Sequence, residues 1–72
     1  MPRKRSLIPA APMAEILKRA GAERVSEEAS RAFAELLLDY SMELAKDAVK
    51  FANHAGRKTV KRQDIILAKK SA

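Results

Sequence analysis

Apolar residues recur at helical spacing in three stretches of the chain, and the first of these is short. One face of this stretch carries Met13, Ile16, Leu17 and Ala20. Pro12 suits the first turn of a helix because its φ is fixed and its missing N–H would have no partner there, whereas Gly21 favours the end of a helix. Because Pro9 and Pro12 interrupt any longer pattern, the sequence predicts a helix of about two turns that begins at Pro12.

The second stretch is long and predicts the main helix of the fold. Ser26 can cap backbone N–H groups at its start, and Glu27 and Glu28 favour the positive end of the helix dipole. No Gly or Pro occurs between Ser26 and Gly56, so we expect one helix from about residue 26 to residue 55. Two neighbouring apolar stripes run along it, the first with Ala29, Ala32, Phe33, Leu36, Leu37, Tyr40, Leu44, Ala48, Phe51, Ala52 and Ala55, the second with Ala34, Leu38, Ala45 and Val49. The remaining polar stripe is narrow, so most of the circumference of the helix must be covered.

One chain cannot supply that cover. A helix of this length would extend ~45 Å, whereas a compact domain of 72 residues has a diameter of roughly 30 Å. Two short flanking helices cannot enclose such a helix, and no Gly or Pro gives it a reason to bend. A chain of this size also needs a staple, a metal or a partner to offset its conformational entropy. We therefore expect an obligate dimer.

The third stretch follows a turn at Gly56. Residues 57–60 predict a continuation of this turn into a short extended segment. The last helix is expected to begin near Lys61, with Asp64 in its first turn. Its apolar face consists of Ile65, Ile66, Leu67 and Ala68. The chain therefore predicts an all-α fold in the order short helix, loop, long helix, loop, short helix.

Composition and charge narrow the class of protein. Fifteen Lys and Arg against nine Asp and Glu give a net charge of +6, and 47% hydrophobic residues are too many for a disordered tail. The positive charge lies at the two ends, because residues 1–5 carry +3, residues 6–56 carry −2 and residues 57–72 carry +5. The sequence thus predicts one small basic domain that folds.

Several classes of function are disfavoured by what the sequence lacks. With no Cys and a single His, His54, one chain cannot assemble a zinc ligand set, and we expect no metal and no cofactor. Apolar runs are too short to span a bilayer, and residues 2–5 lack the apolar stretch of a secretory signal, so we expect a cytoplasmic protein. Candidate acid and base groups are scattered without a nucleophile beside a base, which argues against an enzyme. Aromatic residues are 4% of the chain and the apolar surface surrounds the long helix, which argues against a membrane-surface helix.

Two loop motifs carry a resemblance to a known family. Residues 20–26 read AGAERVS, and residues 54–61 read HAGRKTVK and are followed by Asp64 and Ile65. Together with Ala11 and Pro12, these motifs resemble those of archaeal histones, over roughly residues 11–68 and without a gap. The match is specific because the two motifs bracket a helix of the length found in that family.

The resemblance implies the histone fold as an intertwined handshake dimer, in which the first loop of one chain lies beside the second loop of the other. It implies an architectural protein that wraps and compacts double-stranded DNA largely without sequence specificity. Arg24 matches an arginine that enters the minor groove, Thr59 a threonine that pairs with it across the dimer, and Lys58 a phosphate contact. Ser26 is first of all a helix cap, although it could also face DNA. The full set of expected DNA-binding residues is Arg24, Lys58, Thr59, Ser26, Lys18, Arg19, Arg57, Lys61 and Arg62.

The resemblance also implies a contact between dimers that builds nucleosome-like or filament complexes. His54 would pair there with Asp64 of another dimer, and Phe51 and Leu67 would form the apolar part, unless these two are plain core residues. Arg57 and Asp64 are placed like the intrachain salt bridge of the family. The expected partners are double-stranded DNA, a second copy of the chain, higher oligomers and a related histone chain, with no membrane, in association with the chromosome or nucleoid.

Two features depart from the family pattern. Glu15 stands where an arginine or another polar group is common, and its charge would repel phosphate unless it pairs with Lys18 or Arg19. We expect residues 1–10 to form a basic flexible arm ahead of a histone-fold domain at 11–72. We also expect this arm to add nonspecific phosphate affinity, the alternative being a merely solubilising tail. A rival function is an interaction module that heterodimerises within a transcription or repair assembly and touches DNA weakly.

Overall fold

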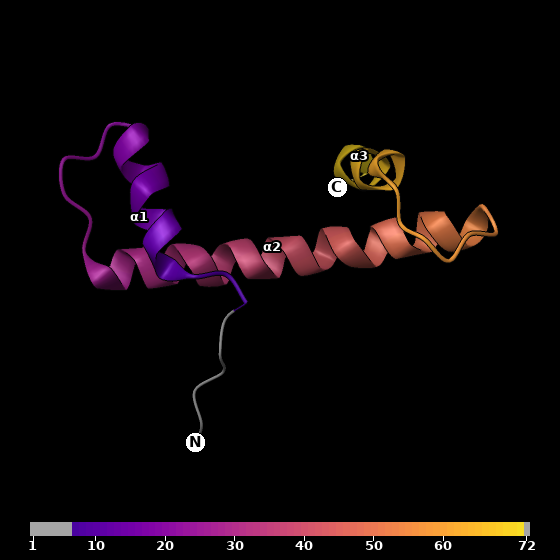
Figure 1. Ribbon diagram of the computed structural model, residues 1–72, viewed down its shortest axis with the longest axis horizontal. Coiled ribbons are helices and arrows are strands. Elements are labelled where there is room, and N and C mark those ends of the chain that lie inside the picture. The colour runs from indigo at the N-terminus through magenta and orange to yellow at the C-terminus, as the bar shows by residue number, and fades with distance from the viewer. Residues whose placement is uncertain (1–6, 72) are drawn as a thin grey trace, which may run out of the picture. The chain divides into compact units, whose positions relative to one another are not determined.

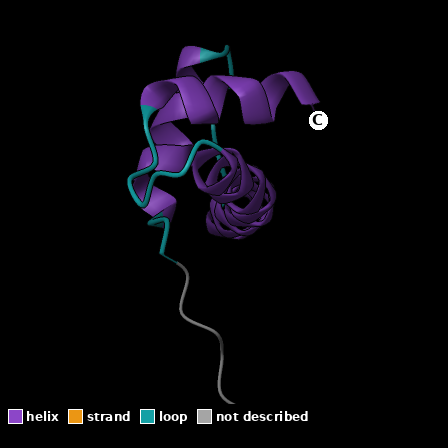
Figure 2. Ribbon diagram, turned by 90° about the vertical axis from the view of Figure 1, so that its right-hand side faces the viewer, coloured by secondary structure: helices purple, strands orange, loops and turns teal. Residues whose placement is uncertain are grey.

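The computed structural model describes residues 7–71, and these form three helices: α1 (Ala10–Arg19), α2 (Glu27–His54) and α3 (Arg62–Ser71). Residues 1–6 of the expected arm, among them the basic residues Arg3, Lys4 and Arg5, lie outside this range. Between residues 7 and 71 the chain forms helices and loops without a strand (Figure 2). The predicted all-α order of short, long and short helices is therefore confirmed.

The chain divides into two compact units, Met1–Asp39 and Tyr40–Ala72. In the first unit, α1 lies beside the first half of α2 (Figure 1). In the second unit, α3 lies beside the second half of α2 and crosses it. Each unit thus packs one short helix on one half of the long helix.

The start of α1 differs from the sequence prediction. The helix begins at Ala10, two residues before Pro12, and Pro9 precedes it with an extended backbone. Pro12 is tolerated as the third helical residue because N–H groups in the first turn have no intrahelical acceptor. Expecting the helix to begin at Pro12 was wrong because Pro fits anywhere in the first turn and not at its first residue alone.

Gly21 ends α1 as predicted. Its φ of 122° is unfavourable for residues with a Cβ. The N–H of Gly21 donates to the carbonyl of Lys18 and the N–H of Ala22 to that of Leu17, both at 3.0 Å. This pair of bonds is a Schellman motif, which satisfies carbonyls left open at the end of the helix.

Gly56 ends α2 by the same motif. Its φ is 74°, its N–H donates to the carbonyl of Asn53, and the N–H of Arg57 donates to that of Ala52, both at 2.9 Å. The Ala-Gly pair common to the two loop motifs therefore produces the same chain reversal twice, once before each remaining helix.

Ser26 caps the start of α2. Its Oγ accepts a hydrogen bond from the N–H of Ala29 at 3.0 Å, and its carbonyl accepts the N–H of Ser30 at 3.1 Å. Glu27 in the first turn also forms a 3.1 Å ion pair with Arg31. The observed helix lies within one residue of the predicted 26–55 at each end.

The interior of each unit is built mostly from small residues. In the first unit Met13 of α1 is buried, as are Ser30 and Ala34 of α2. In the second unit, the buried residues are Ala48, Ala52, Asp64 and Ala68. Small side chains let the helix backbones approach closely, but they bury little apolar area per residue.

Large apolar side chains remain exposed on α2. Leu36 of the first stripe is 67% exposed, and Tyr40 is also exposed. Val49 of the second stripe and Met42 are exposed as well. Within the described chain, α1 and α3 therefore leave part of both stripes of α2 uncovered.

The described residues add two observations on other classes of function. No helix among them is both long enough and apolar enough to cross a membrane. Between residues 7 and 71, His, Asp and Glu side chains do not gather in groups of three or more that could hold a metal ion.

Candidate nucleic-acid interface

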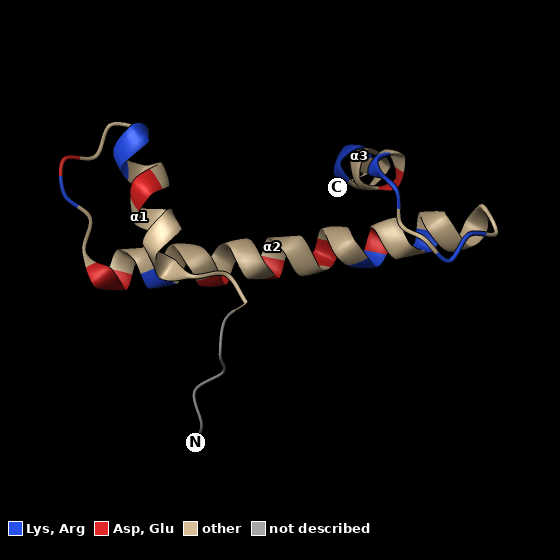
Figure 3. Cartoon of the chain, viewed as in Figure 1, with Lys and Arg blue, Asp and Glu red and all other residues tan. Residues whose placement is uncertain are grey.

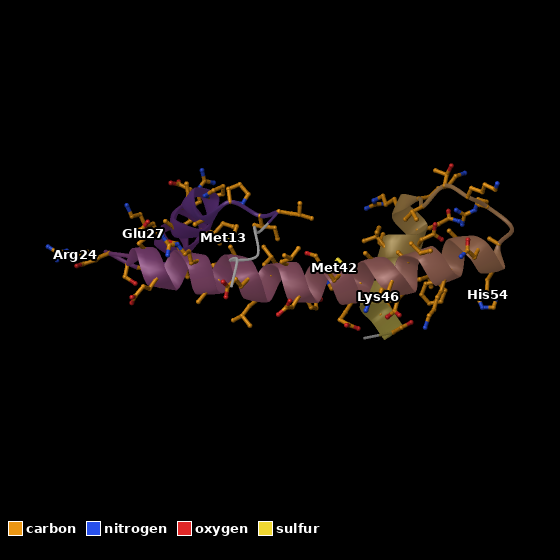
Figure 4. All side chains as sticks on the ribbon, turned by 90° about the horizontal axis from the view of Figure 1, so that it is seen from below. Met13, Arg24, Glu27, Met42, Lys46 and His54 are labelled. Carbon is orange, nitrogen blue, oxygen red and sulfur yellow. The ribbon has the colours of Figure 1, made fainter. Side chains whose placement is uncertain are left out.

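The first loop presents an exposed arginine at the start of α2. Arg24 extends away from the ribbon of the loop (Figure 4). Ser26, two residues later, uses its Oγ to accept the N–H of Ala29, so this oxygen is already occupied as an acceptor. Its hydroxyl proton can still be donated to an anion. The acids Glu27 and Glu28 follow in the first turn of α2, so Arg24 supplies the positive charge of this loop next to acidic neighbours (Figure 3).

The second loop is held together by one guanidinium and one carboxylate. Nη1 and Nη2 of Arg57 donate to Oδ2 and Oδ1 of Asp64, each at 2.9 Å. Nη1 also donates to the carbonyl of Thr59 at 2.8 Å. Asp64 is 1% exposed, so the carboxylate of this bidentate ion pair is shielded from water. The salt bridge implied by the family resemblance is thus present.

Asp64 also caps α3. Its Oδ2 accepts the backbone N–H of Lys61 at 2.8 Å. This is half of a capping box, in which an acid in the first turn reaches back to the residue before the helix. The absence of a hydroxyl at position 61 is therefore compensated by Asp64, which joins the loop to the helix from both sides.

These contacts shift the ionisation of both partners. The hydrogen bond from Arg57 lowers the pKa of Asp64 from 3.8 to about 2, with help from the backbone N–H of Lys61 and from the positive charge of Arg57. The same hydrogen bond raises the pKa of Arg57. Both groups are therefore charged at neutral pH, and the loop keeps its shape there.

Positive charge is left free to face solvent around this anchored loop. Lys58 and Thr59 are exposed in the loop, as are Lys61 and Arg62 at the start of α3. Basic residues follow one another along this loop in Figure 3. Because the guanidinium of Arg57 binds Thr59 and Asp64, its role in this conformation is to hold the loop, while the neighbouring cations remain available to an anion.

The end of α1 carries two more cations. Lys18 and Arg19 are both exposed in the last turn of the helix. Nε of Arg19 lies 3.1 Å from Oε2 of Glu15, one turn earlier. Of the two partners expected for Glu15, the structure selects Arg19.

Comparison with known proteins assigns the family. Residues 6–68 match the family model described as histone-like transcription factor (CBF/NF-Y) and archaeal histone. The chain belongs to this histone-fold family. It is 53% identical over 64 residues to one of the chains of archaeal histone HAN1 of Thermococcus zilligii, a match that covers 89% of this chain and 96% of that protein. It is also 52% identical over 58 residues to probable archaeal histone 3 of Methanocaldococcus jannaschii, covering 81% of this chain and 87% of that protein.

Membership of the histone-fold family indicates what kind of ligand the two loops face. The family is one of structural DNA-binding proteins rather than of enzymes, so this histone belongs with chromatin proteins. Its two loop motifs fall in the segments that precede α2 and α3, and each ends at a capped helix start.

The residues expected between dimers are placed less uniformly. His54 is exposed at the last residue of α2 (Figure 4). Together with Lys50 and Asn53 it lines a shallow depression in the surface. Leu67 is exposed and Phe51 is half-buried. Asp64 is buried and its oxygens are bound by Arg57 and Lys61 within the same chain. A pairing of His54 with Asp64 of another copy stays a prediction and would have to share a carboxylate that is already engaged.

One structural role escaped sequence reasoning. Asp64 closes the second loop onto Lys61 as well as onto Arg57. An acid three residues after the residue that precedes the helix was the available signal, since that is the spacing of a capping box.

Proposed function

We propose that this histone acts as a handshake dimer that binds and wraps double-stranded DNA, largely without sequence specificity. The observation that carries this function is the form of the two loops. The first loop presents one exposed cation and the second loop several, each next to a helix start, and each loop is fixed by local hydrogen bonds before any ligand binds. Phosphate groups fit such a place, because backbone N–H groups and the positive end of a helix dipole favour anions.

The exposed apolar residues support the dimer. Leu36, Tyr40, Met42 and Val49 are large side chains left in solvent on α2. Covering them with a second copy would remove from water the area that α1 and α3 leave open, at roughly 25 cal/mol per Å². In the handshake arrangement the second loop of each chain lies beside the first loop of the other, so that Thr59 approaches Arg24 of the partner.

The cations support binding through phosphates rather than through base edges. Arg24, Lys58, Lys61 and Arg62 are exposed and without an ion pair among the described contacts. Two copies of these four give eight potential phosphate contacts, which correspond to a slope of about −7 in log K against log salt. Contacts of this kind position DNA but carry no sequence information, so preferences would come from the flexibility of the duplex.

The proposed function also includes assembly of dimers into larger complexes and association with the chromosome. Dimers would join through His54, Phe51, Leu67 and Asp64 into nucleosome-like or filament complexes associated with the chromosome in the cytoplasm. The basic arm, residues 1–10, would add phosphate affinity ahead of the histone-fold domain, residues 11–72.

A second candidate is an interaction module that pairs with a related histone chain in a transcription assembly. It is favoured by the family description, which covers histone-like transcription factors together with archaeal histones. Such a module needs its partner chain in order to bind DNA, whereas the proposed homodimer binds alone.

The two functions separate in an equilibrium binding experiment with purified protein. Binding to two duplexes of equal length and unrelated sequence is measured across a range of salt concentrations. We expect similar affinities for the two duplexes and a steep salt slope. The Arg24→Ala/Lys58→Ala variant should lose about 3.6 units of slope as a dimer, from four contacts at about 0.9 each.

Lys69→Ala is the matched control for this experiment, because Lys69 is an exposed lysine at the far end of α3 from the loop. We expect its salt slope to stay close to that of the wild type. A preference for one duplex of a thousandfold or more would contradict nonspecific binding. Binding that requires a second histone chain would favour the interaction module.

A further inference from the structure

We propose that Glu15 limits the affinity of this histone for DNA, because its carboxylate neutralises Arg19 at the end of α1. This role rests on the proposed DNA binding and adds a residue that works against it. Arg19 would then add no net positive charge to the surface that α1 presents to phosphate.

Glu15 and Arg19 lie on the same face of α1. They are one turn apart, and Nε of Arg19 is 3.1 Å from Oε2 of Glu15. Their side chains are 61% and 79% exposed, respectively, whereas Met13 is the buried residue of this helix. The ion pair therefore lies on the solvent side of α1, where a large anion can reach it.

The neighbouring charges show what Glu15 changes. Lys18 and Arg19 form the basic last turn of α1, and Arg24 follows in the loop of the same unit (Figure 3). Without Glu15, the last turn of α1 would carry two unpaired cations, and Glu23 would remain as the one acid between them and Arg24. With Glu15, the charge of Arg19 is cancelled, and Lys18 and Arg24 are left as the charges available to phosphate.

An exposed ion pair is weak, so Arg19 could leave Glu15 for a phosphate group. Its departure would leave the carboxylate unpaired within a Debye length of about 8 Å from that phosphate, where repulsion is only partly screened. Binding of DNA to Arg19 would therefore exchange one charge-assisted bond for another and add a repulsion. This is the physical reason why the pair contributes nothing to affinity.

The test compares the salt dependence of DNA binding for the full-length wild type, Glu15→Gln, Arg19→Gln and the double variant. Glu15→Gln should bind more tightly and steepen the slope by up to about 1.8 units, from two released arginines per dimer at about 0.9 each. Between about 50 and 200 mM salt this is an additional loss of affinity of roughly tenfold. Arg19→Gln leaves the carboxylate of Glu15 unpaired and should bind DNA no more tightly than the wild type, whereas the double variant, which removes both charges of the pair, should return to the wild-type slope.

Glu43→Gln is the matched control, because it removes the same charge from an exposed position of α2 that has no ion pair among the described contacts. Its slope should equal that of the wild type. Equal slopes for Glu15→Gln and Glu43→Gln would overturn the role of Glu15, as would a double variant whose slope falls below that of the wild type by about 1.8 units, because Arg19 would then contact phosphate despite Glu15. A wild type with no salt dependence would instead overturn the DNA-binding function itself.

Discussion

Ser26 allows the contribution of a loop residue to stability to be measured separately from its contribution to DNA binding. Replacing Ser26 with Ala removes the hydrogen bond that its Oγ accepts from the N–H of Ala29 at 3.0 Å. That N–H lies in the first turn of α2, where no backbone carbonyl of the helix can accept it. Ala therefore leaves the donor to water, whereas Asp at the same position would restore the acceptor.

The magnitude follows from the number of caps. Losing one N-cap costs about 1 kcal/mol, and a dimer loses two, so the free energy of unfolding the dimer should fall by about 2 kcal/mol. At about 1.4 kcal/mol per factor of ten, this is roughly a thirtyfold change in the unfolding constant. Ser26→Asp should keep the stability within about 0.5 kcal/mol of the wild type, because Asp caps as well as Ser and favours the helix dipole.

Urea unfolding followed by circular dichroism measures the stability, at one protein concentration for all variants. Ser71→Ala, at the last residue of α3, is the control that removes a hydroxyl without a cap at a helix start. DNA binding of the folded variants provides the second measurement, in which Ser26→Ala should stay near the wild type and Ser26→Asp should weaken because it adds negative charge beside Arg24. Unchanged stability in Ser26→Ala, or equal destabilisation by Ala and Asp, would refute the capping argument.

Three further predictions follow from the structure. The Arg57–Asp64 pair holds the pKa of Asp64 at about 2 against an ordinary 3.8, so its contribution to stability is complete above about pH 4 and is lost as the pH falls through 2. As the pH is lowered from 4 to 2, the urea midpoint should therefore fall more steeply in the wild type than in Asp64→Asn, and parallel curves would exclude this pair as the cause of the acid sensitivity. A Cβ at Gly21 or Gly56 would meet no atom within 4 Å, so replacing either with Ala costs backbone strain alone, about 1–2 kcal/mol at Gly56 with φ 74° and more at Gly21 with φ 122°. Thermal unfolding that shows Gly56→Ala to be more destabilised than Gly21→Ala would be inconsistent with this reasoning. Leu36→Lys should destabilise the protein by about 1.5–3 kcal/mol per chain if a second copy covers Leu36, but by less than about 0.5 kcal/mol if the 67% exposure of the single chain persists in solution; sedimentation at matched concentrations would show whether the dimer is lost as well.

Local signals explain why most of the secondary structure could be predicted from the sequence. Ser26 marks the start of α2, and Gly21 and Gly56 mark two helix ends, because capping and positive φ depend on a few neighbouring residues. The start of α1 was missed because Pro12 is compatible with more than one position in a first turn.

The candidate site was predicted in part for the same reason. Arg24 and Lys58 belong to contiguous motifs, and both are exposed in loops as expected. The contacts of Asp64 with Arg57 and Lys61 join residues on both sides of a turn, and periodicity alone does not show which groups meet there. Which apolar residues of α2 stay exposed could not be predicted either, because exposure depends on where the short helices pack, and both stripes contain large apolar residues.

The proposed wrapping of DNA is tested most directly by nuclease digestion of complexes between the purified protein and long duplex DNA. Wrapping predicts protected fragments of defined length, either one size for a closed particle or a regularly growing ladder for an extendable assembly. The protection should disappear in Arg24→Ala/Lys58→Ala and persist in Lys69→Ala. Complete digestion at protein concentrations that saturate the DNA would contradict wrapping.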